Sequence, residues 1–171
     1  MHSIKLIGLL ISSLFLTACI EDLNPESKDL RTISELGPIP SQNFTAVTTQ
    51  NIPVSLEDEL LNNDAVVLYF TMWCPLCDSH MSHMRSRLIS NYTNVRFFMV
   101  DYVSGNISQS RSSQLANGFG DLTLLVDNQQ SLLNSYNATM ASVIVINAEN
   151  TILLNEDYKN GSRLIETLDN L

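Results

Sequence analysis

The chain has 171 residues, which is enough for one domain with a sizeable core. Eighteen acidic residues face nine lysines and arginines, and this gives a formal net charge of −9. Because an acidic surface repels phosphate groups, we expect neither nucleic acid nor anionic lipid headgroups as partners.

The first eighteen residues have the pattern of an export signal. Lys5 precedes an apolar run from Leu6 to Leu16, which is too short to span a bilayer and is typical of a secretory signal peptide. The run Leu16-Thr17-Ala18-Cys19 resembles the lipobox of bacterial lipoproteins. In that family the cysteine is acylated and becomes the first residue of the mature chain.

This resemblance implies that residues 1–18 are removed, that Cys19 carries a lipid anchor, and that the domain stands in the periplasm of a bacterial envelope. Several acyl chains hold a protein stably on a membrane, whereas one chain holds it only marginally. Ile20 stands where lipoproteins of the inner membrane carry aspartate, so the resemblance favours the outer membrane. An ordinary signal peptide, in which Cys19 has no role, is the alternative.

The segment after Cys19 has little periodicity. It contains Asn24-Pro25-Glu26-Ser27 and Gly37-Pro38-Ile39-Pro40, which are turn-forming and extended sequences. We therefore interpret residues 19–43 as a lipidated N-terminus and tether, and residues 44–171 as the folded domain.

The rest of the chain alternates apolar strands with helical segments. Ser55, with Asp58 three residues later, has the form of a capping box and predicts a short helix through Leu61. The pattern then predicts, in chain order, strand 65–71, helix 75–89, strand 95–100, helix 108–117, strand 122–126, helix 129–136, a hairpin of strands 142–147 and 151–155, and a last helix capped by Ser162. We expect an α/β fold, a three-layer α/β/α sandwich whose mixed sheet ends in an antiparallel C-terminal hairpin.

The motif Trp73-Cys74-Pro75-Leu76-Cys77 lies between strand 65–71 and the helix that follows it, which is the context of a redox site. Pro75 fits the first helical position, so Cys74 becomes the N-cap. A thiolate there faces unpaired backbone N–H groups and the positive end of the helix dipole, and we expect its pKa to be lowered. Cys77 points inward, so we interpret Cys74 as the attacking thiol and Cys77 as the buried resolving thiol.

The stretch from Val66 to Cys77 resembles the active-site strand and turn of thioredoxin-fold proteins, most of all the membrane-anchored TlpA/ResA-like thiol–disulfide oxidoreductases. The resemblance implies a thioredoxin-like fold and disulfide exchange with the thiols and disulfides of partner proteins. It also implies that electrons come from a membrane-bound donor, that reduction is the direction, and that no cofactor is required. We expect a monomer.

Two positions depart from the thioredoxin pattern. The position of the cis-proline that faces the cysteines falls on Ala141, after Met140, and no proline follows Pro75. Because cis peptide bonds are essentially confined to proline, we expect a trans bond and a differently shaped loop. The buried acid of thioredoxin corresponds to Leu68, so the usual proton acceptor for the resolving thiol is missing. The side chains that we expect to shape the site are Trp73, Pro75, Leu76, Met140 and Ala141.

The helix after the motif offers a metal-binding alternative. Thiolate, thioether and imidazole together suit Cu(I), so a copper carrier could use Cys74, Cys77 and His80. Met81 and Met84, however, share one stripe with Cys77 at helical spacing, which is typical of a core-facing surface. We therefore favour core methionines, surface histidines and no metal, with His80 close enough for its imidazolium to favour the thiolate of Cys77.

Two further alternatives concern the motif itself. Thr71-Met72-Trp73-Cys74-Pro75 resembles the Thr-x-x-Cys of peroxiredoxins, in which threonine and an arginine hold the peroxide. Val67 stands where that motif has proline, and Arg111 is the available arginine, so a thiol peroxidase is the enzymatic alternative. A zinc site would need a second pair of cysteines or histidines, and a structural disulfide would close a longer loop.

Overall fold

The computed structural model describes residues 39–171. The predicted signal peptide, the lipidated Cys19 and the tether up to residue 38 lie outside the described residues and stay predictions. Among residues 39–171, no helix combines the length and the apolar composition that crossing a membrane requires.

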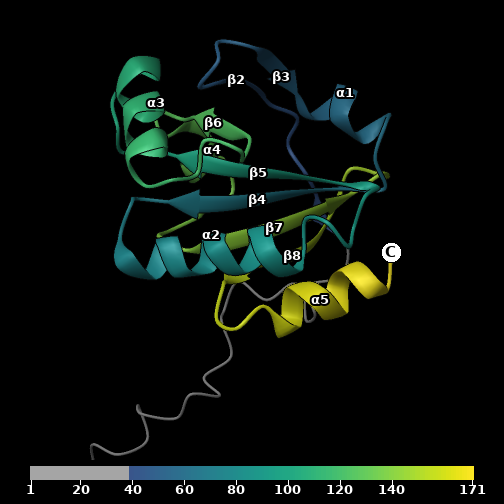
Figure 1. Ribbon diagram of the computed structural model, residues 1–171. Helices are drawn as coiled ribbons and strands as arrows, with labels where there is room; N and C mark the ends of the chain where they lie inside the picture. The colour runs from purple at the N-terminus through teal and green to yellow at the C-terminus, as the bar shows by residue number, and fades with distance from the viewer. Residues whose placement is uncertain (1–38) are drawn as a thin grey trace, which may run out of the picture. The chain divides into compact units, whose positions relative to one another are not determined.

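A single mixed sheet is the centre of the fold (Figure 1). Its strands are β1 (Ile39–Pro40), β2 (Thr45–Thr48), β3 (Pro53–Ser55), β4 (Ala65–Thr71), β5 (Val95–Asp101), β6 (Leu124–Val126), β7 (Ser142–Asn147) and β8 (Thr151–Asp157). Within the described part of the chain, their order in the sheet is β1-β8-β7-β4-β5-β6-β2-β3. β4 pairs in parallel with β5, and β5 with β6, whereas the other neighbouring pairs are antiparallel.

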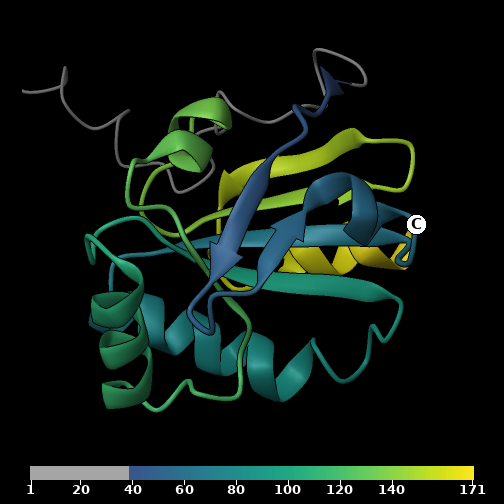
Figure 2. The ribbon, with the colours of Figure 1, turned by 90° about the horizontal axis from the view of Figure 1, so that it is seen from above.

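Helices cover both faces of the sheet, which confirms the predicted three-layer sandwich (Figures 1 and 2). They are α1 (Leu56–Leu60), α2 (Pro75–Arg87), α3 (Ile107–Ala116), α4 (Ser131–Ser135) and α5 (Ser162–Asp169). Side chains of α2 and α5 share one core cluster with the sheet, and side chains of α1 and α4 share the other. The predicted antiparallel hairpin is β7 with β8.

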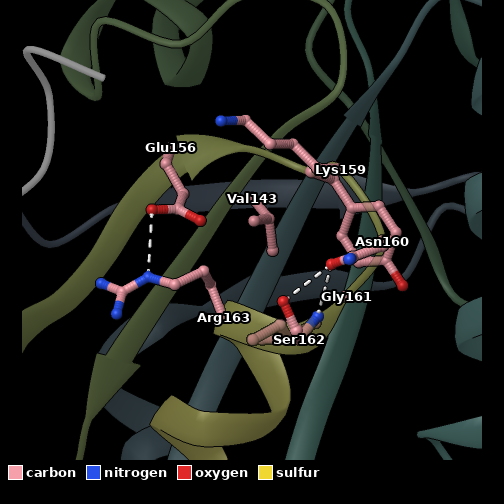
Figure 3. Close-up of a pocket in the computed structure, with 9 residues that line it drawn as sticks. Val143, Glu156, Lys159, Asn160, Gly161, Ser162 and Arg163 are labelled. Atoms are coloured by element: carbon pink, nitrogen blue, oxygen red, sulfur yellow. Dashed lines mark hydrogen bonds and ion pairs between the residues drawn. The ribbon is translucent and has the colours of Figure 1, made fainter. Parts of the chain in front are cut away.

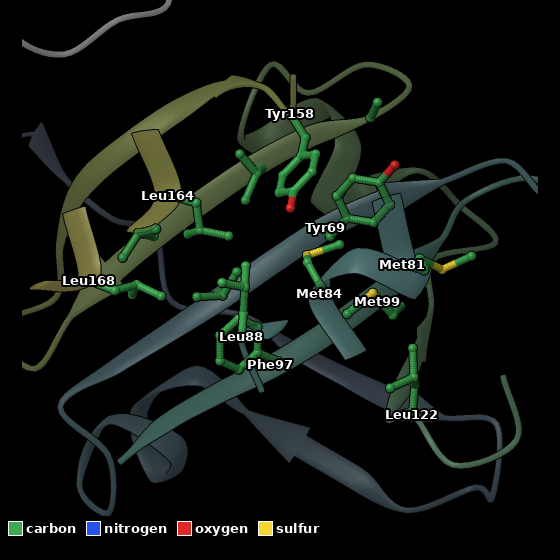
Figure 4. Packing of buried hydrophobic residues seen from close by; sticks show 14 of the residues in the cluster. Tyr69, Met81, Met84, Leu88, Phe97, Met99, Leu122, Tyr158, Leu164 and Leu168 are labelled. Carbon is green, nitrogen blue, oxygen red and sulfur yellow. The ribbon is translucent and has the colours of Figure 1, made fainter. Parts of the chain in front are cut away.

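The central strand β4 contributes to both core clusters, and all seven of its residues are buried. Val67 and Tyr69 face the cluster that contains α2, whereas Val66 and Leu68 face the opposite cluster. A strand covered on both faces needs such a continuous apolar run. Figure 4 shows the cluster on the α2 side, where the predicted core-facing stripe is confirmed by the buried side chains of Met81, Met84 and Leu88.

The start of α1 differs from the prediction in one respect. Ser55 is the N-cap, but its side chain makes no capping hydrogen bond. The N–H of Glu57 instead donates to Oδ1 of Asn43 at 3.2 Å. The capping box is therefore wrong, because a residue distant in sequence supplies the acceptor that local spacing assigned to Ser55.

The last helix also has a different cap. Ser162 is its first helical residue and Gly161 is the N-cap, in a left-handed conformation with φ of 82°. Glycine suits this position because it has no Cβ. A Cβ at Gly161 would meet the hydroxyl of Tyr158 at 2.6 Å. Close packing against Tyr158 therefore explains why Gly161 is the N-cap of α5, the position that the sequence pattern assigned to Ser162.

The folded part begins before residue 44. β1 pairs with Ile152 and Thr151 of β8, and the N–H of Ser41 donates to the carbonyl of Asn150 at 2.8 Å. These contacts make part of the predicted tether an edge strand. The sheet therefore begins at Ile39, at least five residues before the domain start expected at residue 44.

Candidate active site

The two cysteines lie where β4 ends and α2 begins. Cys74 is the N-cap of α2 and Pro75 occupies the start of the helix, as the sequence predicts. The N–H of Cys77 donates to Sγ of Cys74 at 3.2 Å, so this sulfur takes the place of a capping oxygen. Both cysteines are free, with Cys77 fully buried and Cys74 partly exposed. A partner can therefore reach Cys74 and not Cys77.

The two thiols are coupled by a hydrogen bond. Burial opposes ionisation of Cys77, but hydrogen bonds from the Cys74 thiol, the Met72 backbone and the Thr71 hydroxyl outweigh it and lower the pKa of Cys77. Desolvation and the hydrogen bond with Cys77 raise the pKa of Cys74, against the lowering effect of backbone hydrogen bonds from Cys77 and Leu76. The two thiols thus favour a single negative charge between them, and the lowered pKa expected of Cys74 stays a prediction.

Trp73 has a fixed place beside Cys74. Its backbone is left-handed, with φ of 59°, a conformation that bulky residues rarely adopt. Its N–H donates to the hydroxyl of Thr71 at 3.2 Å. Its indole N–H donates to Oδ2 of Asp101 at 3.0 Å and to Oγ of Ser104 at 3.1 Å. These bonds hold the ring and the strained backbone that leads into Cys74.

Asp101 is a site residue that the sequence analysis missed. It is buried at the end of β5, beside the end of β4. Besides the Trp73 indole, it accepts hydrogen bonds from the Ser110 hydroxyl at 2.7 Å and from the N–H groups of Val103 and Ser104. The available signal was a carboxylate at the end of an apolar strand, since parallel strands end at the same edge of a sheet.

The loop before β7 approaches Cys74 from the other side. Sδ of Met140 lies 3.7 Å from Sγ of Cys74. Ala141 has φ of 65°, its N–H donates to the Phe70 carbonyl at 3.0 Å, and its carbonyl accepts from the N–H of Tyr158 at 2.8 Å. Across residues 39–171 every peptide bond is trans, as expected for a loop without proline. The loop has a different backbone conformation from one that proline could adopt.

Apolar side chains surround the exposed sulfur. Met72, Leu76 and Met140 are 41%, 51% and 39% exposed. Exposed apolar patches commonly mark surfaces that bind other proteins, and methionine adapts to partners of different shape. The patch suits the shaping role expected of Leu76 and Met140, which stays a prediction.

Tyr69 lies on the same face of the sheet as Cys77, whereas Leu68 does not. Leu68 is buried in the cluster of α1 and α4, and Tyr69 in the cluster of α2 and α5. The Tyr69 hydroxyl lies 3.0 Å from Nδ1 of His80. Burial, followed by the charge of Cys77, raises the pKa of Tyr69. Position 68 lacks the expected acid, and Tyr69, the next residue, places a hydroxyl-bearing side chain on the α2 side of the sheet.

His80 is buried, with 6% of its surface exposed, whereas a surface position was expected. Burial, with His83 second, lowers the pKa of His80, so the imidazole is neutral at neutral pH. The expected imidazolium beside Cys77 is therefore wrong. Nδ1 is hydrogen-bonded to Tyr69 and is not free to bind copper. In the described part of the chain, no three His, Cys, Asp or Glu side chains form a group that could hold a metal ion.

The residues of the peroxidase alternative do not converge on Cys74. The Thr71 hydroxyl accepts a hydrogen bond from the N–H of Trp73 at 3.2 Å. Arg111 lies on α3 and donates to Oε1 of Gln114 at 2.9 Å. These contacts give a peroxide-binding arrangement no support.

A small cavity of about 130 Å³ lies elsewhere, between β8 and the start of α5 (Figure 3). The ion pair between Glu156 and Arg163, at 3.6 Å, borders it. Neither cysteine lines this cavity. The cavity is therefore separate from the site around the sulfurs.

A protein-family model described as Redoxin matches residues 36–162. No curated protein is similar enough to the chain to count as a match. The putative thiol:disulfide interchange protein DsbE from Chlorobium tepidum is 14% identical, with a TM-score of 0.66 over 78% of this chain and 95% of that one.

Two further solved structures have a similar fold. The secreted Mycobacterium tuberculosis disulfide oxidoreductase homologous to E. coli DsbE is 21% identical, with a TM-score of 0.59 over 75% of this chain and 96% of that one. The exposed lipoprotein thioredoxin of Streptococcus pneumoniae is 18% identical, with a TM-score of 0.62 over 76% and 100%. These likenesses show a thioredoxin-like fold, as predicted.

Proposed function

The chain belongs to the Redoxin family, and from that premise we propose that it is a thiol–disulfide oxidoreductase that exchanges disulfides with partner proteins through Cys74 and Cys77. The observation that carries the proposal is a partly exposed sulfur at the N-cap of α2 with a fully buried sulfur behind it. The outer sulfur can meet a partner while the inner one is held for intramolecular attack.

The exchange begins when Cys74 attacks the disulfide of a partner. The Cys74 thiol loses its proton to solvent as it attacks, and the N–H of Cys77 that donates to Sγ of Cys74 favours the thiolate. A bond forms between Cys74 and one partner sulfur, and the other leaves as a thiolate that takes a proton from water. Cys77 then attacks Cys74 and releases the bound partner sulfur. The partner gains the two electrons that the Cys74–Cys77 pair loses on forming its own disulfide.

The finer proposal is a monomeric reductase of the TlpA/ResA-like group. It would be anchored in a bacterial envelope through Cys19, with the domain in the periplasm, the outer membrane favoured, and a membrane-bound electron donor. Two similar structures support this setting, since one is described as secreted and the other as an exposed lipoprotein. The apolar patch of Met72, Leu76 and Met140 suits a polypeptide partner.

Trapping of mixed disulfides tests the proposal. Cys77→Ser removes the second step, so proteins from envelope extracts should accumulate on Cys74 and be released by reductant. Cys74→Ser is the matched control and should capture none through Cys77, because that thiol is buried. Equal capture by the two variants would overturn the proposed roles.

A further inference from the structure

A third sulfur lies against the exposed sulfur of the cysteine pair. The Cys74 thiol donates to Sδ of Met140 at 3.7 Å. Met140 is 39% exposed, whereas Met81, Met84 and Met99 are buried in the core cluster on the α2 side (Figure 4). Met140 therefore contributes its thioether to the site and not to the packing of the core.

The backbone next to Met140 holds this thioether in place. Ala141 has φ of 65°, and its N–H donates to the Phe70 carbonyl at 3.0 Å. Its carbonyl accepts from the N–H of Tyr158 at 2.8 Å. The first bond ties the loop to β4, the strand that leads to Cys74, and the second ties it to the residue after β8. The contact of Met140 with Cys74 is therefore fixed by the main chain as well as by the two side chains.

Cys77 supplies a second thiol at the same helix start. Its N–H donates to Sγ of Cys74 at 3.2 Å. The exchange proposed above requires the two cysteine sulfurs to come within bonding distance, and in this respect the present inference rests on that function. Because Cys77 is fully buried and Cys74 is partly exposed, an ion bound to both lies at the edge of the core.

Two thiols and one thioether select among metal ions. Soft sulfur ligands favour Cu(I), whereas structural zinc sites almost always have four ligands, taken from thiolate, imidazole and carboxylate groups. Among residues 39–171, no three His, Cys, Asp or Glu side chains are grouped so that they could hold a metal ion. Zinc therefore lacks ligands at this site, while Cu(I) can use the Met140 thioether.

The separation of the two outer sulfurs suits one shared ion. Two sulfurs that each lie about 2.3 Å from one metal ion, the length of a metal–thiolate bond, are about 3.8 Å apart at a tetrahedral angle and about 4.0 Å apart at a trigonal angle. Sγ of Cys74 and Sδ of Met140 are 3.7 Å apart. An ion can therefore replace the thiol proton between them with little movement of either side chain.

We propose that the reduced protein binds one Cu(I) through Sγ of Cys74, Sγ of Cys77 and Sδ of Met140, a metal-binding function beside the disulfide exchange. The ion comes from a cuprous complex, and two thiol protons pass to solvent as two copper–thiolate bonds form. The Met140 sulfur donates a lone pair, and no atom is oxidised or reduced. The N–H of Cys77 and the positive end of the α2 dipole stabilise the single net negative charge that results.

Copper binding and disulfide exchange exclude each other at this site. Both use the electron pairs of the Cys74 sulfur, so a copper-loaded chain cannot attack a partner's disulfide. The disulfide form has no thiolate to offer and should bind no Cu(I). The oxidation state of the pair therefore decides whether the protein can carry the ion.

Competition with bicinchoninate, a chromophoric Cu(I) chelator, tests the site in the reduced full chain without oxygen. Every protein carries Cys19→Ser, so that the third cysteine of the chain contributes no thiol. One Cu(I) per chain should be withdrawn from the chelator. Met140→Leu is expected to weaken the affinity at least about 10-fold, the lower end of what the loss of even an outer-shell partner costs.

Met72→Leu is the matched control for the loss of a thioether. Met72 is 41% exposed, close to the value for Met140, and precedes Trp73 in the chain. Its substitution should leave the Cu(I) affinity unchanged. His80→Asn should also keep the affinity, because Nδ1 of His80 is hydrogen-bonded to Tyr69.

X-ray absorption at the copper edge counts the ligands directly. Three sulfur neighbours are expected around the copper in the unsubstituted protein and two in Met140→Leu. Nitrogen neighbours are expected in neither protein. Cys74→Ser and Cys77→Ser should each lose the copper to the chelator.

The outcomes separate the copper site from the exchange function. Equal Cu(I) affinity in the unsubstituted protein and in Met140→Leu, or two sulfur neighbours in both, overturns the site. Weaker binding by His80→Asn overturns it in favour of the imidazole. If the chelator keeps all the Cu(I), the site fails, and the proposed function stands as long as the Cys74–Cys77 disulfide forms. If copper binds as expected but no such disulfide forms, the function fails and the site stands. Should Met140→Leu not fold, as judged by circular dichroism, the sulfur count in the unsubstituted protein decides.

Discussion

Asp101 links the end of β5 to Trp73, the residue next to the attacking sulfur. Its carboxylate accepts hydrogen bonds from the side chains of Trp73 and Ser110. It also accepts from the backbone N–H groups of Val103 and Ser104. Because Asp101 is buried, its removal takes this acceptor away from the Ser110 hydroxyl and the two backbone N–H groups, and leaves the Trp73 indole with Ser104 alone. An unsatisfied buried donor costs about 1–3 kcal/mol.

Asp101→Ala should therefore lower the free energy of unfolding by about 3 kcal/mol or more. The substitution should also slow the attack of Cys74 on a small disulfide reagent, because the Trp73 side chain loses its hydrogen bond to Asp101. Urea unfolding followed by circular dichroism measures the first effect. Asp121→Ala is the control, since it removes an exposed carboxylate paired with Arg85 and should cost less than about 1 kcal/mol. Similar losses in the two variants would refute the anchoring role.

His80 predicts a pH dependence of stability. Burial, with His83 second, lowers its pKa in the folded protein below the ordinary value of 6.5. As the pH falls below 6.5, the unfolded chain binds a proton that the folded chain does not yet accept, so the free energy of unfolding decreases until the lowered pKa is passed. Urea unfolding across this range should show that slope in the unsubstituted protein and a smaller slope in His80→Asn. Identical slopes in the two proteins would contradict this role of His80 in the pH dependence of stability.

At the scale of elements, the loop before β7 is the part of the site that differs most from the thioredoxin pattern. Ala141 combines φ of 65° with an N–H that donates to the Phe70 carbonyl. Proline fixes φ near about −65° and has no N–H, so it can satisfy neither condition. The loop is thus built around a left-handed residue that also places Met140 against Cys74.

Ala141→Pro is accordingly expected to destabilise the domain by about 3 kcal/mol or more, through the lost hydrogen bond and the forbidden dihedral angle. Ala141→Gly keeps the N–H and permits the positive φ, so it should cost less than about 1 kcal/mol or stabilise the fold. Thermal unfolding of the two variants measures the difference. A proline variant as stable as the glycine variant would show that the loop has another conformation.

Elements with strong local patterns were predictable from the sequence. The apolar run of β4, the proline at the start of α2 and the hairpin of β7 with β8 are encoded within each segment. The caps of α1 and α5 were not, because Asn43 and Tyr158 act on them from other segments. Local spacing identifies a helix start well only when the acceptor is a near neighbour.

At the scale of the whole molecule, sheet topology assembles the site. The parallel strands β4 and β5 end at one edge, which places Asp101 beside the turn that carries Cys74. The antiparallel partner β7 enters at the same end and contributes Met140. The sequence motif identifies the two sulfurs, but their neighbours depend on strand order, which a motif does not contain.

The burial of Tyr69 and His80 shows the same limit. A tyrosine in β4 and a histidine on α2 each fit an ordinary core or surface role when considered alone. Packing of α2 on β4 brings the hydroxyl and the imidazole to 3.0 Å from each other. Such a pair becomes visible only when the helix is seated on the sheet.

A redox titration of the reduced domain against glutathione tests the central claim most directly. After acid quench and alkylation, intact mass reports the number of free thiols at each potential. We predict one two-electron transition from the dithiol to a Cys74–Cys77 disulfide, absent in Cys74→Ser and in Cys77→Ser. Two free thiols at every potential, or glutathione adducts without an intramolecular disulfide, would contradict it.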